Sequence, residues 1–145
     1  MASVLVIQGG GMDERGKTKV EIFGPETIDQ INAQIRQGAG DMGLSVEILQ
    51  SNDVSEVVQF LESLTPNNAP GFIAGIINPA GFTTLTGTLP DAVSKLPFPM
   101  YEVHASNPAS RGVISAILPV CRGAICGFGY TGYQLALQAI KGQTV

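Results

Sequence analysis

The chain contains a single histidine, His104, and the residues around it suggest proton-transfer chemistry. His104 closes an apolar-biased run that starts at Phe98, and the polar residues Ser106 and Asn107 follow it. Histidine exchanges a proton near neutral pH because its ordinary pKa is about 6.5. Strand alternation puts Glu102 on the same face, where a carboxylate could fix the ring tautomer and favour the protonated form. The pattern predicts a general acid or base, although a lone histidine at a strand end could also serve only as a hydrogen-bonding residue.

A second polar side chain, Asn78, directly follows another apolar run and begins the sequence Asn-Pro-Ala-Gly. In an open α/β sheet, ligands bind beyond the carboxyl ends of the strands, so Asn78 and His104 are expected at the same edge. A side-chain amide there could donate to an oxyanion or hold a water. Asparagine is also a common turn residue, which would explain Asn78 without any function.

The elements that must position these residues follow from the hydrophobic pattern. Helical periodicity alternates with short apolar runs along the whole chain, with no internal repeat or linker. The expected strands cover residues 3–7, 44–49, 72–77, 97–103 and 122–126, and the expected helices cover 25–43, 53–64, 83–96 and 130–140. The run 72–77 is apolar throughout and predicts a central strand. This order predicts a single α/β domain over residues 1–145, a flavodoxin-like three-layer sandwich with a five-stranded parallel sheet.

The segment 12–24 is rich in charged residues and begins and ends beside a glycine. A loop of this length without structure of its own is usually functional or disordered, so the segment is interpreted as a lid. The preceding run of three glycines, 9–11, lacks the lysine and serine or threonine of a phosphate-binding loop. That absence argues against nucleotide binding.

The composition argues against several functional classes of protein. Of 145 residues 44% are hydrophobic and 14% are charged, and the net charge is −4. The missing basic cluster argues against nucleic acid, and the short apolar runs argue against a membrane helix. Cys121 and Cys126 lack the spacing of metal ligands, so no metal site is expected. Both cysteines are expected to act as small buried hydrophobic residues. Scarce charge predicts a homo-oligomer, and the N-terminus resembles a first strand more than a signal peptide, which together predict a cytoplasmic protein.

An ordered set of short motifs spans nearly the whole chain: Val6-Ile7 before glycine, Phe23-Gly24, Gln50-Ser51-Asn52 with Glu56, Asn78-Pro79-Ala80-Gly81, Asp91, Glu102-Val103-His104 with Ser106-Asn107, and Gly127-Phe128-Gly129 with Gly132-Tyr133. With these motifs at matching spacings, the chain resembles the type II 3-dehydroquinate dehydratases. The resemblance implies the flavodoxin-like fold, a dodecamer built as a tetramer of trimers, a small carboxylic-acid substrate, and no metal or organic cofactor.

The resemblance also implies roles for individual residues. In the family a lid tyrosine, activated by an arginine, removes a proton beside the substrate ketone, and an asparagine holds the water that stabilises the enolate. A histidine oriented by a glutamate then protonates the departing hydroxyl. The positions that match are Asn78 for the asparagine, His104 for the acid, Glu102 for its partner, Ala105 and Ser106 for the carboxylate cradle, and Asp91 for an aspartate that reaches a neighbouring subunit's site.

Other positions depart from the family pattern. Phe23 stands where the lid tyrosine belongs, and a phenyl ring cannot act as a base. The lid also carries Arg15, Lys17, Thr18 and Lys19, with Thr18 at the place of the activating arginine. Gly11 replaces a lid-proximal asparagine and Thr84 replaces a substrate-contacting histidine. Ser115 stands at the place of an arginine that contacts substrate hydroxyls, and Arg111 lies one turn earlier.

Loss of a general base typically lowers a rate by roughly 10²–10⁴-fold. The sequence therefore predicts a divergent lyase of this family, a dehydratase or related proton-transfer enzyme that acts on a cyclic or carbonyl-activated carboxylic acid. Its base would be Lys17, Lys19, Glu21, a water, or His104 serving both steps. The alternatives are a genuine 3-dehydroquinate dehydratase with a relocated base and a non-catalytic metabolite-binding or scaffold protein.

Overall fold

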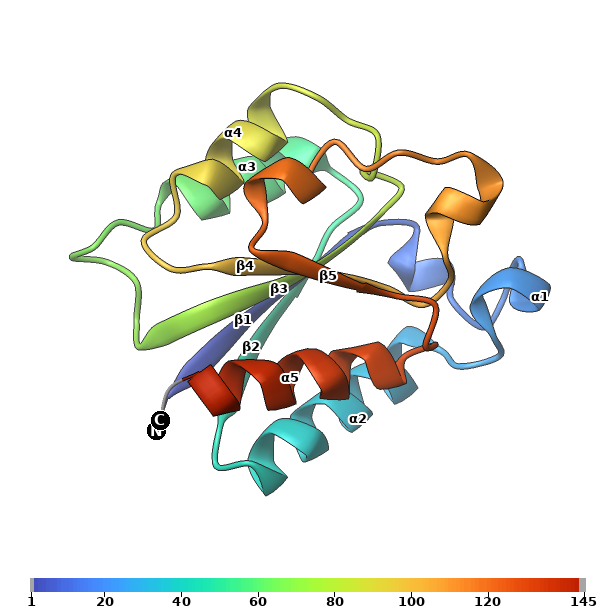
Figure 1. The fold of residues 1–145 in the computed structure, drawn as a ribbon, viewed down its shortest axis with the longest axis horizontal. Coiled ribbons are helices and arrows are strands. Elements are labelled where there is room, and N and C mark those ends of the chain that lie inside the picture. The colour runs from blue at the N-terminus through green and yellow to red at the C-terminus, as the bar shows by residue number, and fades with distance from the viewer. Residues whose placement is uncertain (1, 144–145) are drawn as a thin grey trace.

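A five-stranded parallel sheet forms the centre of the computed structural model, which describes residues 2–143 (Figure 1). The strand order is β2-β1-β3-β4-β5. The strands are β1 Ser3–Gly10, β2 Ser45–Gln50, β3 Phe72–Ala80, β4 Met100–His104 and β5 Gly123–Cys126. The predicted α/β class, the parallel sheet and the central position of β3 are confirmed.

Helices cover both faces of the sheet and complete the three layers. In Figure 1, α2 and α5 lie on one face and α3 and α4 on the other, while α1 lies at the end of the sheet to which the strands run. The helices are α1 Val20–Phe23, α2 Ile28–Asp41, α3 Val54–Glu62, α4 Thr88–Ser94 and α5 Thr131–Gln143, and three 3-10 turns are η1 Met12–Glu14, η2 Pro108–Arg111 and η3 Leu118–Val120.

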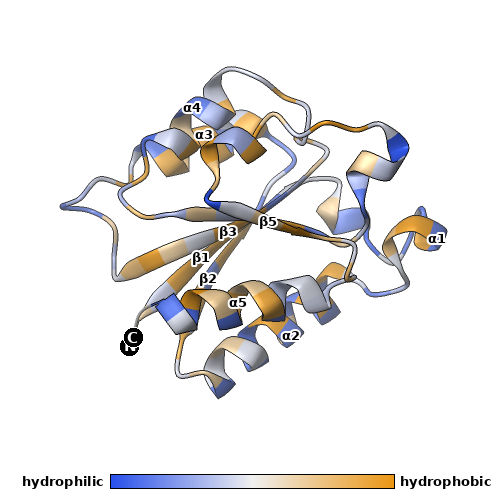
Figure 2. Cartoon of the chain, in the orientation of Figure 1, coloured by the Kyte–Doolittle hydropathy of each residue, from blue (hydrophilic) through white to orange (hydrophobic). Residues whose placement is uncertain are grey.

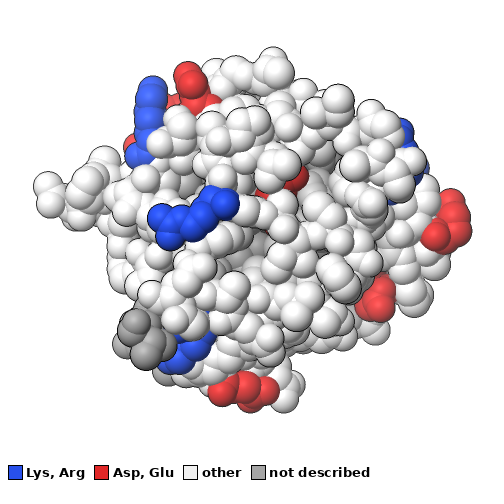
Figure 3. All heavy atoms as spheres, viewed as in Figure 1, with Lys and Arg blue, Asp and Glu red and all other residues white. Residues whose placement is uncertain are grey.

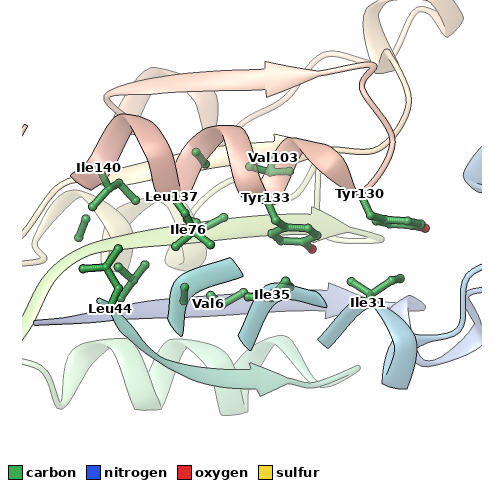
Figure 4. Packing of buried hydrophobic residues seen from close by; sticks show 14 of the residues in the cluster. Val6, Ile31, Ile35, Leu44, Ile76, Val103, Tyr130, Tyr133, Leu137 and Ile140 are labelled. Carbon is green, nitrogen blue, oxygen red and sulfur yellow. The ribbon is translucent and has the colours of Figure 1, made fainter. Parts of the chain in front are cut away.

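Two hydrophobic clusters, one on each face of the sheet, hold these layers together. The inner faces of α2 and α5 are apolar and their outer faces polar (Figure 2). Figure 4 shows how Ile31 and Ile35 of α2 meet Tyr133 and Leu137 of α5 beside Val6 and its neighbours on the sheet. Burying a side chain of this size contributes about 1.5–3 kcal/mol, so each cluster fixes the strand ends firmly.

Several element boundaries differ from the predictions because local capping decides them. The Thr27 side chain and Gln30 form a capping box, so α2 begins after residues 25–27 and not at Pro25. Asp53 caps α3 by accepting a hydrogen bond from the backbone N–H of Ser55 at 2.9 Å, so the helix begins at Val54. The helix predicted over 83–96 is shortened to α4, and β3 extends three residues beyond 77.

The lid segment 12–24 was predicted as a loop without its own structure, and that prediction is wrong. It contains η1 and α1, separated by a turn at Gly16. Elements of three and four residues are too short to show a helical period in the sequence. Both cysteines are free, and each is only partly buried, so the prediction of buried hydrophobes is also wrong.

Charged side chains are sparse on the face shown in Figure 3 and form no large patch of one sign. This agrees with the low charged fraction of the sequence. Within residues 2–143, no helix is both long and apolar enough to cross a bilayer.

Candidate active site

The Glu102 and His104 side chains lie on the same face of β4, as the alternation of strand residues predicted. Glu102 Oε2 and His104 Nε2 form a short hydrogen bond, and both side chains are buried. The second Glu102 oxygen, Oε1, accepts a hydrogen bond from Ser115 Oγ at 2.8 Å. The carboxylate is therefore held at both oxygens, which fixes the position of the imidazole at the strand end.

Ser115 is anchored in turn by the backbone. Its Oγ accepts hydrogen bonds from the backbone N–H groups of Ile117 and Leu118, each at 3.1 Å. Ser115 occupies the position of an arginine that contacts substrate hydroxyls in the family. Its side chain lies against Glu102 and does not line the cavity described below. The short serine hydroxyl can reach the buried carboxylate, and two N–H donors orient it to donate.

Asn78 lies at the carboxyl end of β3 and is 2% exposed. Its amide lies beside the Tyr133 hydroxyl, which also adjoins Gln8 of β1. Burial raises the pKa of Tyr133 to about 12, and the interactions with Asn78 and Gln8 oppose that rise. The phenol therefore stays neutral at physiological pH, and its hydroxyl makes no well-aligned hydrogen bond within the described residues.

Close backbone contacts hold neighbouring strand ends together at this edge, the end of β1 with the end of β3 and the end of β4 with the end of β5. The Gly81 N–H donates to the Gly10 carbonyl at 2.7 Å, and a Cβ at position 81 would lie 2.8 Å from that oxygen. On the other side, the Gly127 N–H donates to the His104 carbonyl at 3.2 Å. Only glycine permits the first approach, so Gly81 fixes the segment after Asn78 against β1, at the edge where Asn78 and His104 line one cavity.

A cavity of about 400 Å³ opens at this edge and brings most of the predicted site residues together. Its walls come from the ends of β1, β3 and β4, the lid, and the segment around η2. The lining residues are Gly10, Gly11, Glu14, Arg15, Thr18, Lys19, Phe23, Asn78, Ala80, Gly81, Thr83, Thr84, His104, Ala105, Ser106, Pro108, Arg111 and Val113.

Two guanidinium groups approach the ring of Phe23. The Arg15 Cζ lies 3.8 Å from the ring centroid and the Arg111 Cζ lies 5.9 Å from it. Arg111 also donates from Nη1 to Ser106 Oγ at 2.9 Å. Arg111 therefore connects the strand-end wall with the lid, and cation–π contact holds Arg15 on the lid itself.

Not every predicted site residue reaches the cavity. Of the lid residues, Lys17 and Glu21 do not line it. Asp91 lines a separate cavity of about 360 Å³ between α3 and α4, away from His104 within this chain. Sequence reasoning missed Glu14, whose position opposite the strand ends depends on the η1 turn that the sequence pattern did not predict.

Side-chain hydrogen bonds from Asn52 hold the first residues of the lid in place. Asn52, just beyond β2, accepts from the backbone N–H of Gly11 at 3.0 Å and donates to Asp13 Oδ2 at 3.2 Å. Met12 is fully buried between these contacts. Over the described part of the chain, no three histidine, cysteine, aspartate or glutamate side chains gather as a metal site would require.

The chain matches a family of known proteins over nearly its whole length. The family model described as dehydroquinase class II matches residues 2–141. A 3-dehydroquinate dehydratase of Caldanaerobacter subterraneus is 37% identical over 144 residues, covering 97% of this chain and 95% of the relative. One from Geotalea daltonii is 38% identical over 141 residues and covers 94% of each.

Solved structures agree with the sequence relatives. The type II dehydroquinase of Propionibacterium acnes superposes with a TM-score of 0.89 at 27% identity, covering 98% of this chain and 97% of that one. A 3-dehydroquinate dehydratase-like protein of Bifidobacterium longum gives a TM-score of 0.73 at 30% identity, covering 100% and 99%. The chain therefore belongs to the class II dehydroquinase family, and it is an enzyme of the lyase class.

Proposed function

We propose that this protein is a 3-dehydroquinate dehydratase, which removes water from a cyclic hydroxy ketone that carries a carboxylate. The observation that carries the proposal is the buried Glu102–His104 pair at a cavity that Asn78 and Ser106 also line. Relatives at 37–38% identity are named for the same reaction. These relatives favour the relocated-base alternative over the divergent lyase that the sequence alone predicted.

Each residue has a role that its position supports. A base takes the proton from the carbon beside the ketone, and the ketone oxygen becomes an enolate oxygen. Asn78 stabilises that oxygen directly or through a water. His104, held by Glu102, then donates its proton to the departing hydroxyl, which leaves as water while the carbon–carbon double bond forms. Ala105 and Ser106, with Arg111 behind Ser106, hold the substrate carboxylate.

The base must come from another residue than Phe23, whose ring cannot accept a proton. Lys17 and Glu21 were predicted as candidates but do not line the cavity, whereas Glu14 and Lys19 do. A glutamate is ordinarily ionised at neutral pH and ready to accept a proton, but a lysine ordinarily carries its proton already. We therefore assign the base to Glu14, which the sequence prediction did not include.

A second candidate keeps the reaction type but changes the substrate to another cyclic or carbonyl-activated carboxylic acid. It is favoured by Phe23 and Thr84, which line the cavity where the family pattern has groups that contact substrate. A site built to hydrogen-bond a hydroxyl strongly rejects substrates that lack it, so a site in which Phe23 and Thr84 replace such groups would accept a less hydroxylated acid.

Turnover of 3-dehydroquinate, followed by the absorbance of the conjugated enone product, tests the proposal. We expect measurable wild-type activity and a loss of roughly 10²–10⁴-fold in kcat for Glu14→Gln, because a general base contributes about that much. Glu21→Gln removes a lid glutamate that does not line the cavity, and it should retain wild-type activity.

Two other results would count against parts of the proposal. Wild-type turnover that survives Glu14→Gln would reject Glu14 as the base. Absence of wild-type turnover, with activity gained in the Phe23→Tyr, Thr18→Arg double variant, would favour the second substrate, because the rest of the site would then be shown to work.

We also propose that the protein assembles into the family's dodecamer, a tetramer of trimers, and acts in the cytoplasm. Large hydrophobic side chains on the isolated chain support assembly: Ile114 is 83% exposed and Phe128 is 64% exposed. The two free cysteines are compatible with a reducing compartment. Light scattering on the purified protein would give the mass of the assembly.

A further inference from the structure

Arg15 is a buried cation on the lid side of the cavity. Its side chain is 9% exposed, and its Nε has no hydrogen-bond partner among the described residues. No aspartate or glutamate in residues 2–143 lies within ion-pairing distance of it. Burying a charge without a partner costs several kcal/mol, so a cation kept in this position calls for an anion that this chain does not itself supply.

The surroundings hold Arg15 in place without neutralising it. The Phe23 ring packs against the guanidinium at 3.8 Å. The backbone N–H of Arg15 donates to the Met12 carbonyl at 3.2 Å, which fixes the residue at the end of η1. Gly16 follows in a left-handed conformation, and a Cβ there would lie 2.7 Å from the Pro25 carbonyl oxygen. The lid backbone is therefore set around Arg15 by its packing.

Tyr130 adjoins Arg15 on the side of the core. Figure 4 shows the Tyr130 ring beyond Tyr133, with its hydroxyl pointing away from the labelled apolar residues. The hydroxyl is buried and makes no well-aligned hydrogen bond within the described chain. Burial raises the pKa of Tyr130, and the nearby Arg15 charge opposes that rise. A neutral phenol can orient the guanidinium, but it does not neutralise its charge.

The cavity as a whole is electropositive. Three cationic side chains line it, Arg15, Lys19 and Arg111, whereas Glu14 is the one lining carboxylate in the described residues. Arg15 and Arg111 approach the same Phe23 ring, so a small ligand in the cavity can contact both. Arginine binds oxyanions with two parallel N–H donors, which suits a carboxylate or an enolate oxygen.

We infer that Arg15 is a substrate-binding residue that holds an oxyanion on the lid side, while Ser106 and Arg111 hold the carboxylate on the opposite side. The inference rests on the proposed function where the oxyanion is the enolate oxygen, whereas a second carboxylate would belong to the other carboxylic acid that is the second candidate substrate. In this arrangement the Phe23 ring packs against the Arg15 guanidinium and holds it in place. The oxyanion has two possible sources, a second carboxylate present in the ground state or the enolate oxygen that forms during turnover.

Calorimetric titration with two probes tests ground-state binding. The probes are cyclohexanecarboxylate and trans-cyclohexane-1,4-dicarboxylate, and the variants are Arg15→Gln, Arg15→Lys and, as the control, Arg36→Gln on the exposed face of α2. A lost charge-assisted hydrogen bond costs about 1.5–3 kcal/mol, so we expect Arg15→Gln to weaken dicarboxylate binding roughly 10- to 100-fold. Monocarboxylate binding should change little, and Arg15→Lys should recover only part of the loss.

Steady-state kinetics with 3-dehydroquinate tests the enolate as the source. A fall in kcat for Arg15→Gln at unchanged KM would identify the enolate oxygen, because the contact would then form only in the transition state. A rise in KM at unchanged kcat would identify a contact with the ground state. Phe23→Leu, which removes the ring but no charge, should reproduce part of either effect.

The inference is overturned if Arg15→Gln, folded as judged by its thermal unfolding, changes neither dicarboxylate binding nor kcat/KM relative to Arg36→Gln. That result would leave the proposed function standing if the wild type still dehydrates 3-dehydroquinate. Conversely, Arg15-dependent dicarboxylate binding by a wild type that leaves 3-dehydroquinate unchanged would retain the inference and reject the proposed function.

Discussion

The two walls of the cavity are built differently. The strand-end wall carries Asn78 and His104, and Glu102 lies behind His104; all three are at most 6% exposed and stand on inner strands of the sheet. The lid wall carries Thr18 and Lys19, which are exposed, on a segment whose one α-helix has four residues. The histidine that we propose as the proton donor is thus positioned by the hydrophobic core, whereas the groups opposite it depend on a few local contacts.

The two walls therefore differ in how freely their residues can change. The strand-end residues cannot change without disturbing the core or leaving a buried polar group unpaired. Thr18 is exposed and Phe23 is half-buried beside the cavity, so a change at either position costs the fold little. A lid of this kind is where substrate preference can change while the reaction type stays the same.

On the strand-end wall, the largest effect is expected from loss of the proposed general acid. His104→Ala should lower kcat by roughly 10²–10⁴-fold, the usual contribution of a general acid, and turnover of 3-dehydroquinate measures it. His104→Gln, which keeps volume beside Glu102, should lose as much. Ser110→Ala, in the exposed η2 turn outside the cavity lining, is the control. If His104→Gln keeps a tenth of wild-type turnover, the strand-end wall does not supply the acid.

Much of the strand-end wall could be predicted from the sequence. The alternation of side chains along a strand is fixed geometry, so Glu102 and His104 had to share a face. Parallel strands end at one edge, so Asn78 had to lie near them. The Ser115–Glu102 hydrogen bond could not be predicted. It depends on the path of the segment between β4 and β5, whose sequence shows no hydrophobic periodicity from which that path could be inferred.

The lid was less predictable for the same physical reason. The pairing of Arg15 with Phe23 depends on a three-residue 3-10 turn followed by a left-handed glycine, and neither produces a hydrophobic repeat. The sequence indicated a mobile functional segment from its charge and glycines alone. It could not distinguish which lid side chains face the cavity, so Glu14 was missed and Lys17 was included.

The fall of folding stability at alkaline pH is expected to differ between Tyr133 in the core and Tyr130 beside the lid. Tyr133, fully buried, has a pKa raised to about 12. Above pH 10 the unfolded chain ionises this phenol before the folded protein does, so stability is complete below pH 10 and falls between pH 10 and 12. The fall attributable to Tyr133 is at most about 2–3 kcal/mol.

Denaturant unfolding of wild type and Tyr133→Phe between pH 8 and 12 measures this fall as a difference in slope. Tyr130→Phe is the matched comparison at the lid side, where burial also raises the pKa but Arg15 opposes it. We expect Tyr130→Phe to remove less of the alkaline dependence than Tyr133→Phe does. Equal effects would contradict the contrast between the two walls.

The smallest effect concerns the lid backbone itself. Lys19 has φ 50° and ψ 39°, a left-handed conformation that costs a lysine about 1–2 kcal/mol. Lys19→Gly relieves this cost but adds about 0.5–1 kcal/mol of unfolded-state entropy, so we expect a net stabilisation of about 1 kcal/mol or less. Lys17→Gly, at an exposed lid residue without positive φ, should destabilise by about 0.5–1 kcal/mol. The two variants should therefore shift the denaturant midpoint in opposite directions, and a shift in the same direction would show that the lid backbone carries no strain at Lys19.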